Sequence, residues 1–340
     1  MPPADAQSAQ ASPAPPEPRT TFSGLVFGDY YHFSADHSAA WAGQEGIWFR
    51  RIYATFDYRF TPKVESRLRL EMNSDGSLEG GLLTPYVKDV WLRWTFAGRQ
   101  QLTLGMHPSV AIDHLESVWG LRHIEKTPLD LYRWDSSRET GISVAGPLNA
   151  AATLRYQVQA GNDSGSGSET DRFKDIRAAV LYEAKSGLVL EGMYGFFAHD
   201  AHANRTTVQA FAAYRRQQVR AAFQYALQQR RAKDGTPDPD SRLDVYSGFV
   251  VADLKPRKFS LFARVDRHDD PCPDGESIDY LPIDPTAAFT LLIAGAEYYF
   301  LPAVRFSPNV EWVRYSAPSD PGAPRPGNDV VWRATFYWAW

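Results

Sequence analysis

The stretch Asp329-Val-Val-Trp-Arg-Ala-Thr-Phe-Tyr-Trp-Ala-Trp340 alternates large apolar side chains with polar ones. Successive side chains of an extended strand point to opposite faces, so this stretch has an aromatic face and a polar face. Chain ends usually fray into solvent, whereas a strand that closes a membrane barrel places its rings against lipid. The stretch therefore predicts the closing strand of a transmembrane β-barrel. Its aromatic face carries Val330, Trp332, Phe336, Trp338 and Trp340, and its polar face carries Asp329, Arg333, Thr335 and Tyr337.

The same alternation recurs along the whole chain, with no convincing helix between the strand-like segments. Most segments reach the ~9–11 residues that a tilted strand needs to cross a bilayer. Tight turns and long polar loops alternate between them, as they do in barrels whose turns are short at one end and long at the other. We expect strands near 20–33, 46–60, 63–73, 86–97, 100–107, 137–146, 151–161, 172–184, 187–199, 204–216, 217–231, 241–254, 257–268, 287–300, 303–315 and 328–340.

These segments predict an all-β fold, a transmembrane antiparallel β-barrel of about 16 strands over residues 20–340. Residues 1–19 are rich in Pro and Ala and are expected to form a disordered N-terminal arm. The alternative is a soluble β-sandwich or lipocalin-like barrel, but its loops would be evenly short and its interior apolar. The faces of segment 241–254 stay open, because its alternation is ambiguous.

Composition agrees with an exported barrel. No run reaches the ~18 consecutive apolar residues of a transmembrane helix, while aromatic residues make up 14% of the chain and suit two interfacial girdles. The single cysteine, Cys272, lies in a polar Pro/Asp-rich stretch and is expected in a surface loop. The formal charge of -4 gives no support for nucleic-acid binding.

The first residues lack the basic and apolar regions of a secretory signal. A barrel of this type must be exported, so we interpret the sequence as a mature chain whose signal peptide has been removed. The expected location is the bacterial outer membrane, in contact with its lipid.

The alternation also predicts which side chains face the lumen. A barrel of about sixteen strands encloses an aqueous channel, and arginine offers a planar fork of donors for phosphate or carboxylate. The alternative is a structural role, in which most of these arginines pair with inward carboxylates of the barrel wall. The candidate pore-lining, anion-guiding residues are Arg51, Arg59, Arg67, Arg69, Arg93, Arg155, Arg220 and Arg264.

Residues 108–136 form a connection of a different kind. They are too apolar for an external loop and also carry basic groups. Long connections of this kind are usually functional, and folding inward would bury the apolar side chains against the wall. We expect an inward-folded constriction loop; an ordered cap or a subunit contact is the alternative. Its candidate solute-facing residues are Arg122, His123, Lys126 and Arg133.

No enzyme constellation stands out in the sequence. Serine, histidine and aspartate do not gather as nucleophilic catalysis requires, and the histidines have no spacing typical of a metal site. The acidic stretch of Asp269, Asp270, Asp274 and Glu276 is better explained as a solvated loop than as a cation site. We therefore expect no catalytic activity, no cofactor and no bound metal.

Several short motifs resemble the phosphate-selective porin O and P family over roughly residues 46–185. Arg50-Arg-Ile-Tyr-Ala-Thr-Phe56 is similar to its second-strand arginine pair. Lys88-Asp-Val-Trp-Leu-Arg93, followed by Leu102-Thr-Leu-Gly-Met-His-Pro108, resembles its "K-D-A-Y-L" strand and the hairpin exit after it. Arg138–Gly146 and Tyr156–Asn162 fit the next hairpin.

The resemblance implies an outer-membrane porin, a sixteen-stranded homotrimer with an inward constriction loop and arginines that guide anions. His107 stands where the family usually has lysine, and a dense inward lysine cluster is missing. The sequence therefore favours passive diffusion of small hydrophilic solutes with a mild preference for anions such as phosphate. The alternatives are a general or cation-preferring porin, or a barrel scaffold for a periplasmic or extracellular partner.

Overall fold

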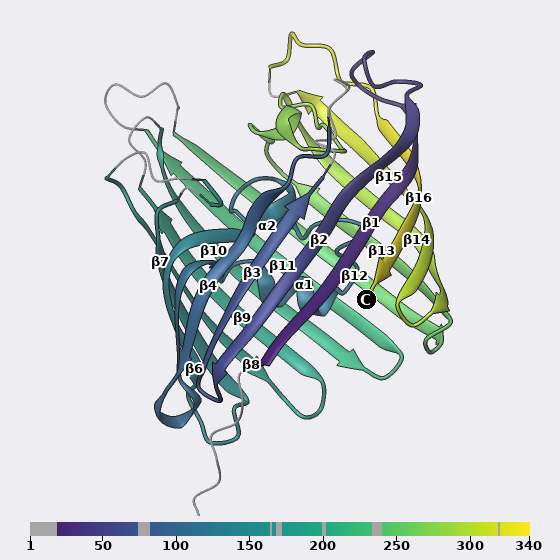
Figure 1. Cartoon of the computed structure of the whole chain (residues 1–340). Coiled ribbons are helices and arrows are strands. Elements are labelled where there is room, and N and C mark those ends of the chain that lie inside the picture. Colours follow the sequence, from purple (N-terminus) through teal and green to yellow (C-terminus); the bar gives the residue numbers. More distant parts are fainter. Residues whose placement is uncertain are drawn as a thin grey trace, which may run out of the picture.

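The computed structural model describes residues 19–73, 82–163, 165–167, 172–198, 202–232, 240–318 and 320–340. Within these ranges the chain forms a closed barrel of sixteen antiparallel strands, in which every strand pairs with its sequence neighbours and β1 pairs with β16 (Figure 1). The predicted fold class and strand count are confirmed. Residues 1–18 of the predicted N-terminal arm lie outside the described residues, and Arg19 begins the first strand.

The strand boundaries follow the predicted segments closely. The strands are β1 (Arg19–Ala35), β2 (Glu45–Thr61), β3 (Val64–Met72), β4 (Tyr86–Thr95), β5 (Gln101–Pro108), β6 (Arg138–Pro147), β7 (Leu154–Gly161), β8 (Asp175–Glu183), β9 (Leu188–Phe197), β10 (Asn204–Arg216), β11 (Val219–Arg231), β12 (Ser241–Lys255), β13 (Phe259–His268), β14 (Ala287–Leu301), β15 (Val304–Pro318) and β16 (Asp329–Ala339). Two short helices, α1 (Asp113–Trp119) and α2 (Pro128–Leu131), and two 3₁₀ turns, Ala97–Arg99 and Gly275–Ser277, complete the described elements. No helix in the described ranges is long and apolar enough to cross a membrane.

The alternation of side chains decides which face of each strand is exposed. In the closing strand β16, Asp329, Arg333 and Thr335 are buried inside the barrel, whereas Trp332 and Trp338 are exposed on its outer surface. The two predicted faces of this strand are confirmed. A one-residue shift in pairing would exchange the faces, so the pattern fixes the register of each strand.

Among several irregularities in the described strands, two β-bulges turn basic side chains inward. In β2, Arg51 pairs with Phe27 and Phe49 pairs with Gly28, so Arg50 is the extra residue. Both Arg50 and Arg51 are consequently buried in the interior. In β4 the register shift beside Asp89 makes Lys88 the extra residue in the same way.

Part of the interior is apolar. The connection between β5 and β6, residues 109–137, runs inside the barrel and is called the internal segment below (Figure 1). It packs against inward side chains of β12 to β16, which resolves the open faces of strand 241–254: Leu243, Val245 and Val251 point inward. The wall side chains of β12 to β16 in this core are Leu243, Val245, Val251, Phe262, Ala287, Phe289, Leu291, Ile293, Val313, Tyr315 and Val331, and other strands add Phe33, Trp48, Ala179, Met193 and Ala226.

The connection between β13 and β14, residues 269–286, also folds into this core. Cys272 is fully buried, so its predicted position in an exposed surface loop is wrong. Its neighbours Ile278, Tyr280 and Ile283 are buried as well. The polar residues around Cys272 in the sequence face solvent, while the thiol inserts near the carbonyl oxygen of Tyr132.

Gly105 provides a test of the barrel's packing. Its φ of +114° disfavours any other residue, and an added Cβ would lie 2.3 Å from the carbonyl oxygen of Val90. We expect Gly105→Ala to lower the free energy of unfolding by about 1–3 kcal/mol, because alanine is strained in this backbone conformation. Urea unfolding in phospholipid vesicles, followed by tryptophan fluorescence, measures this change.

The matched control is Gly192→Ala, since an added Cβ at Gly192 meets no atom within 4 Å and the backbone there is extended. This variant is expected to stay within about 0.5 kcal/mol of the parent. Equal destabilisation of the two variants would contradict the packing of β5 against β4.

Candidate functional site

The internal segment is held in the lumen by its apolar side chains. In α1, Leu115, Val118 and Trp119 are buried on one helix face, as spacings of three and four residues require. Gly120 ends the helix in the left-handed conformation, with φ of 68°. The ring of Trp119 packs on Phe249 of β12 with 4.8 Å between ring centroids. These contacts place the opposite, polar face of α1 toward open space in the lumen.

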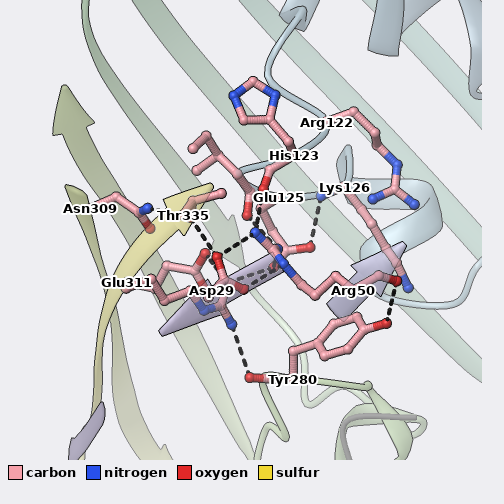
Figure 2. A network of polar contacts seen from close by, with 12 residues as sticks. Asp29, Arg50, Arg122, His123, Glu125, Lys126, Tyr280, Asn309, Glu311 and Thr335 are labelled. Atoms are coloured by element: carbon pink, nitrogen blue, oxygen red, sulfur yellow. Dashed lines mark hydrogen bonds and ion pairs between the residues drawn. The ribbon is translucent and has the colours of Figure 1, made fainter. Parts of the chain in front are cut away.

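A buried ionic cluster ties the same segment to the wall (Figure 2). Arg50 of β2 pairs with Asp29 of β1 at 2.7 Å, and its guanidinium donates to the backbone carbonyls of His123 and Ile124. Arg333 of β16 pairs with Glu125 of the segment at 3.2 Å. Arg50 and Arg333 thus bring strands from both sides of the barrel closure onto one short stretch of backbone.

The cluster is fully desolvated and extends further. Arg333 also pairs with Glu311 at 2.5 Å and donates to the backbone carbonyl of Tyr280 at 2.9 Å. Burial opposes the charge of Glu125, yet Arg333 and Arg50 prevail and hold the pKa of this carboxyl below its ordinary value. A buried charge that loses its partner is costly, so the cluster fixes the segment to this side of the lumen.

In the described part of the chain, three large cavities occupy the rest of the lumen. Two lie toward the short turns, with volumes of about 620 and 490 Å³, and share Asp113 of α1. The third, of about 440 Å³, lies toward the long loops. Because the internal segment covers β12 to β16, the cavities lie mainly along β1 to β10.

The 620 Å³ cavity gathers half of the predicted pore-lining arginines. Arg59, Arg67, Arg69 and Arg93 all line it. Arg67 pairs with Asp57 at 2.7 Å, Arg69 with Asp89 at 3.1 Å and Arg93 with Glu65 at 3.6 Å. Arg59 is exposed and forms no ion pair within the described ranges. The described residues that line the 620 Å³ cavity include six arginines but only three carboxylates, Asp57, Glu65 and Asp113.

The cavity toward the long loops gathers a second predicted group. Arg51, Lys126 and Arg133 line it together with Lys88 and Asp130. Arg51 pairs with Glu71 at 2.7 Å, while Arg133 donates to the backbone carbonyl of Ser277. Arg155 lies apart from both groups, in the 490 Å³ cavity, where it pairs with Glu183 at 2.5 Å.

Arg122 lies on the internal segment between two carboxylates. Its guanidinium is 2.7 Å from Glu116 and 3.1 Å from Asp130, and its side chain is 23% exposed. Burial opposes its charge, but Glu116 and Asp130 hold the pKa of Arg122 above its ordinary value. This side chain therefore stays charged and offers the lumen a cation flanked by acids.

Besides Arg122, three predicted site residues line none of the cavities described above. Arg264 is buried beneath the segment, where it pairs with Asp266 at 2.5 Å and donates to the carbonyl of Lys126. His123 faces the wall and pairs with Glu297 at 2.5 Å. Arg220 lies next to Gly120 and has no hydrogen bond or ion pair in the described part of the chain. Arg264 and His123 therefore hold the internal segment in place and do not face solute.

Sequence reasoning missed four basic residues of this region. Arg50 and Lys88 are turned inward by the bulges, which no alternation pattern reveals. Arg138 begins β6 out of phase with the inward set and pairs with Asp89. Arg19 was assigned to the N-terminal arm, yet it begins β1 and lines the 620 Å³ cavity.

Comparisons with known proteins agree on the fold. The chain is similar to the solved anion-selective porin from Comamonas acidovorans, with 13% identity, 95% of this chain and 100% of that chain covered, and a TM-score of 0.69. It is also similar to the outer membrane channel DcaP of Acinetobacter baumannii, with 10% identity, 97% and 99% covered, and a TM-score of 0.64. OmpT of Vibrio cholerae in its trimer form gives 11% identity, 95% and 99% covered, and a TM-score of 0.63. No protein-family model and no curated protein matches the sequence.

The buried cluster leads to a stability prediction. Arg50→Ala leaves Asp29 without its arginine partner and frees the carbonyls of the internal segment, so we expect a loss of about 3–5 kcal/mol in unfolding free energy. Arg67→Ala removes a partly exposed pair and should change stability by at most about 1 kcal/mol. Urea unfolding of the folded barrel compares the two. A cost for Arg50→Ala no larger than that for Arg67→Ala would show that the cluster does not hold the segment.

Proposed function

We propose that the chain is an outer-membrane porin, a water-filled channel through which small hydrophilic solutes diffuse passively, with a mild preference for anions such as phosphate. The observation that carries this proposal is the division of the lumen. An internal segment fills one side, and cavities lined by charged side chains occupy the other side toward both ends of the barrel. A barrel with a purely structural role would be expected to fill its lumen with packed side chains and to have no cavities lined by charged residues.

The outer surface supports a position in the lipid bilayer. Large apolar side chains such as Phe223, Leu104 and Trp332 are more than half exposed there, and a surface of this kind is stable only against lipid or protein. We further propose that the short turns face the periplasm and that the chain assembles as a homotrimer. The trimer form of the similar Vibrio cholerae protein supports the second point.

The proposed anion preference arises where water is scarce. In a low-dielectric passage, nearby unbalanced charges outweigh the small net charge of the whole protein. Six arginines line the 620 Å³ cavity, and they outnumber its three lining carboxylates together with Asp89, which pairs with Arg69 and Arg138. Arginine suits phosphate and carboxylate through its fork of donors, but most of these arginines already pair with acids of the wall. Attraction without tight binding is what rapid diffusion requires.

We assign the role of a constriction loop to the predicted residues 108–136. Asp130 lines the 440 Å³ cavity and pairs with Arg122, which also pairs with Glu116 and is 23% exposed. Solutes passing this point would meet a guanidinium and two carboxylates within a few ångströms. The segment would thereby set both the conductance and the charge selectivity.

Single-channel recording in planar lipid bilayers tests the proposal directly. Purified, detergent-folded protein should produce stepwise, ohmic conductance, and a salt gradient should give a reversal potential of the sign expected for anion preference. A folded barrel that inserts without conductance would overturn the channel proposal. A reversal potential of the cationic sign would leave a porin but remove the anion preference.

Charge variants locate the selectivity. Arg122→Ala should shift the reversal potential toward cation preference, and Asp130→Asn should shift it the opposite way, because both groups lie on the internal segment. Asp269→Asn is the matched control, since Asp269 is exposed at the rim and pairs with Arg267, where salt screens charges beyond about 8–10 Å. A larger shift for the control than for Arg122→Ala would contradict the assigned role of the segment. Heat-dependent electrophoretic mobility verifies that each variant is folded.

A further inference from the structure

A group of acidic and imidazole side chains outside the lumen cavities lies at the long-loop end of the barrel. Asp36 and His37 follow β1, and Asp329 begins β16. Glu276 and Asp284 belong to the segment between β13 and β14. Three regions far apart in the sequence therefore converge on one imidazole ring.

The distances around His37 match those of a metal coordination sphere. Its Nδ1 lies 3.0 and 3.1 Å from the two carboxylate oxygens of Asp329 and 3.5 Å from Oδ1 of Asp36. Bonds of about 2.0–2.2 Å to a common Zn²⁺ ion would separate neighbouring ligand atoms by roughly 3.0–3.6 Å. The side chains of Asp36 and Asp329 are fully buried, and that of His37 is 5% exposed.

The imidazole of His37 is the basic group that Asp36, Glu276 and Asp329 share. None of these carboxylates pairs with lysine or arginine within the described ranges. Asp36 accepts a backbone hydrogen bond from Ser38 at Oδ1, whereas its buried Oδ2 has no hydrogen-bond partner there. Buried carboxylates of this kind are found paired or bound to a cation. Asp36 therefore presents a free ligand atom beside two further donors.

The surrounding contacts orient the donors as in known metal centres. Nε2 of His37 lies 3.2 Å from Glu276, so the ring can donate to this carboxylate when Nδ1 binds a cation in place of its hydrogen-bond contacts with Asp329 and Tyr315. The hydroxyl of Tyr315 donates to Oδ2 of Asp329 at 2.5 Å. The backbone amide of His37 donates to Oδ1 of Asp329 at 2.6 Å. Glu276 thus orients the imidazole of His37, and Tyr315 and the His37 backbone amide orient the carboxylate of Asp329.

We propose that Asp36, His37 and Asp329 form a binding site for a divalent transition-metal cation of the Zn²⁺ type. Imidazole together with carboxylate favours such ions over Ca²⁺ and Mg²⁺, which prefer all-oxygen ligands. Three protein ligands leave one tetrahedral position for water. The bound cation cross-links the loop after β1 to β16, and through Glu276 it restrains the segment that carries Tyr280. This inference does not rest on the channel function.

Isothermal titration calorimetry of the detergent-solubilised barrel with Zn²⁺ tests the site. We expect one ion per chain, binding lost in Asp36→Asn and in His37→Ala, and affinity lowered about 10- to 100-fold in Glu276→Gln, which removes only the orienting partner. Asp320→Asn is the matched control because this exposed acid lies in the nearby loop before β16. Loss of binding in the control, or unchanged binding in Asp36→Asn, would overturn the proposal.

A second measurement needs no variant and so does not depend on folding of a mutant. Co²⁺ bound by imidazole and carboxylate in a four- or five-coordinate site gives visible d–d absorption stronger than that of hydrated Co²⁺. We expect this spectrum to appear at one equivalent and to disappear when Zn²⁺ is added. A spectrum identical to that of free Co²⁺, or the absence of competition by Zn²⁺, would contradict a shared transition-metal site.

Discussion

The arrangement of the lumen depends on the buried ion pairs of Arg50 and Arg333. These two guanidinium groups satisfy Asp29, Glu125 and Glu311 in a region that water does not reach. Each charge would be very unfavourable alone, so the network tolerates only the position in which the internal segment brings Glu125 and its backbone carbonyls to the wall. Apolar packing buries a large surface of the internal segment, but the ion pairs of Arg50 and Arg333 fix its position along the wall.

This placement gives the two sides of the lumen different chemistry. Many inward side chains of β12 to β16 are apolar and pack against the segment, and the charged ones among them, such as Arg264 and Arg333, are buried in ion pairs. Inward side chains of β2 to β5 stay polar because they face the cavities. The polarity of the inward side chains of a strand therefore depends on whether the internal segment or a cavity lies opposite that strand. Strand β14, with Phe289, Leu291 and Ile293 inside, would be unsuitable for an open aqueous wall.

Much of the fold was predictable from the sequence, because alternation and loop length are local properties. The inward positions of Arg67 and Arg69 follow directly from the alternation of polar and apolar side chains in their strand. Arg50 and Lys88 could not be placed, because one extra residue at a bulge reverses the phase and leaves no trace in composition. The buried position of Cys272 and the ion-pair partners of each arginine depend on contacts between segments distant in sequence. The grouping of His37 with Asp329 across the barrel closure was invisible for the same reason.

The central claim is that the internal segment shields one wall of the lumen and leaves the other open. Substituted-cysteine accessibility tests it most directly, since the one native cysteine, Cys272, is buried and should stay silent. Gln157→Cys lies on the open side and Leu291→Cys on the covered side. We expect a charged methanethiosulfonate reagent to modify the first rapidly and lower the conductance, while the second stays unreactive in the folded barrel. Equal modification of both cysteines would contradict the account.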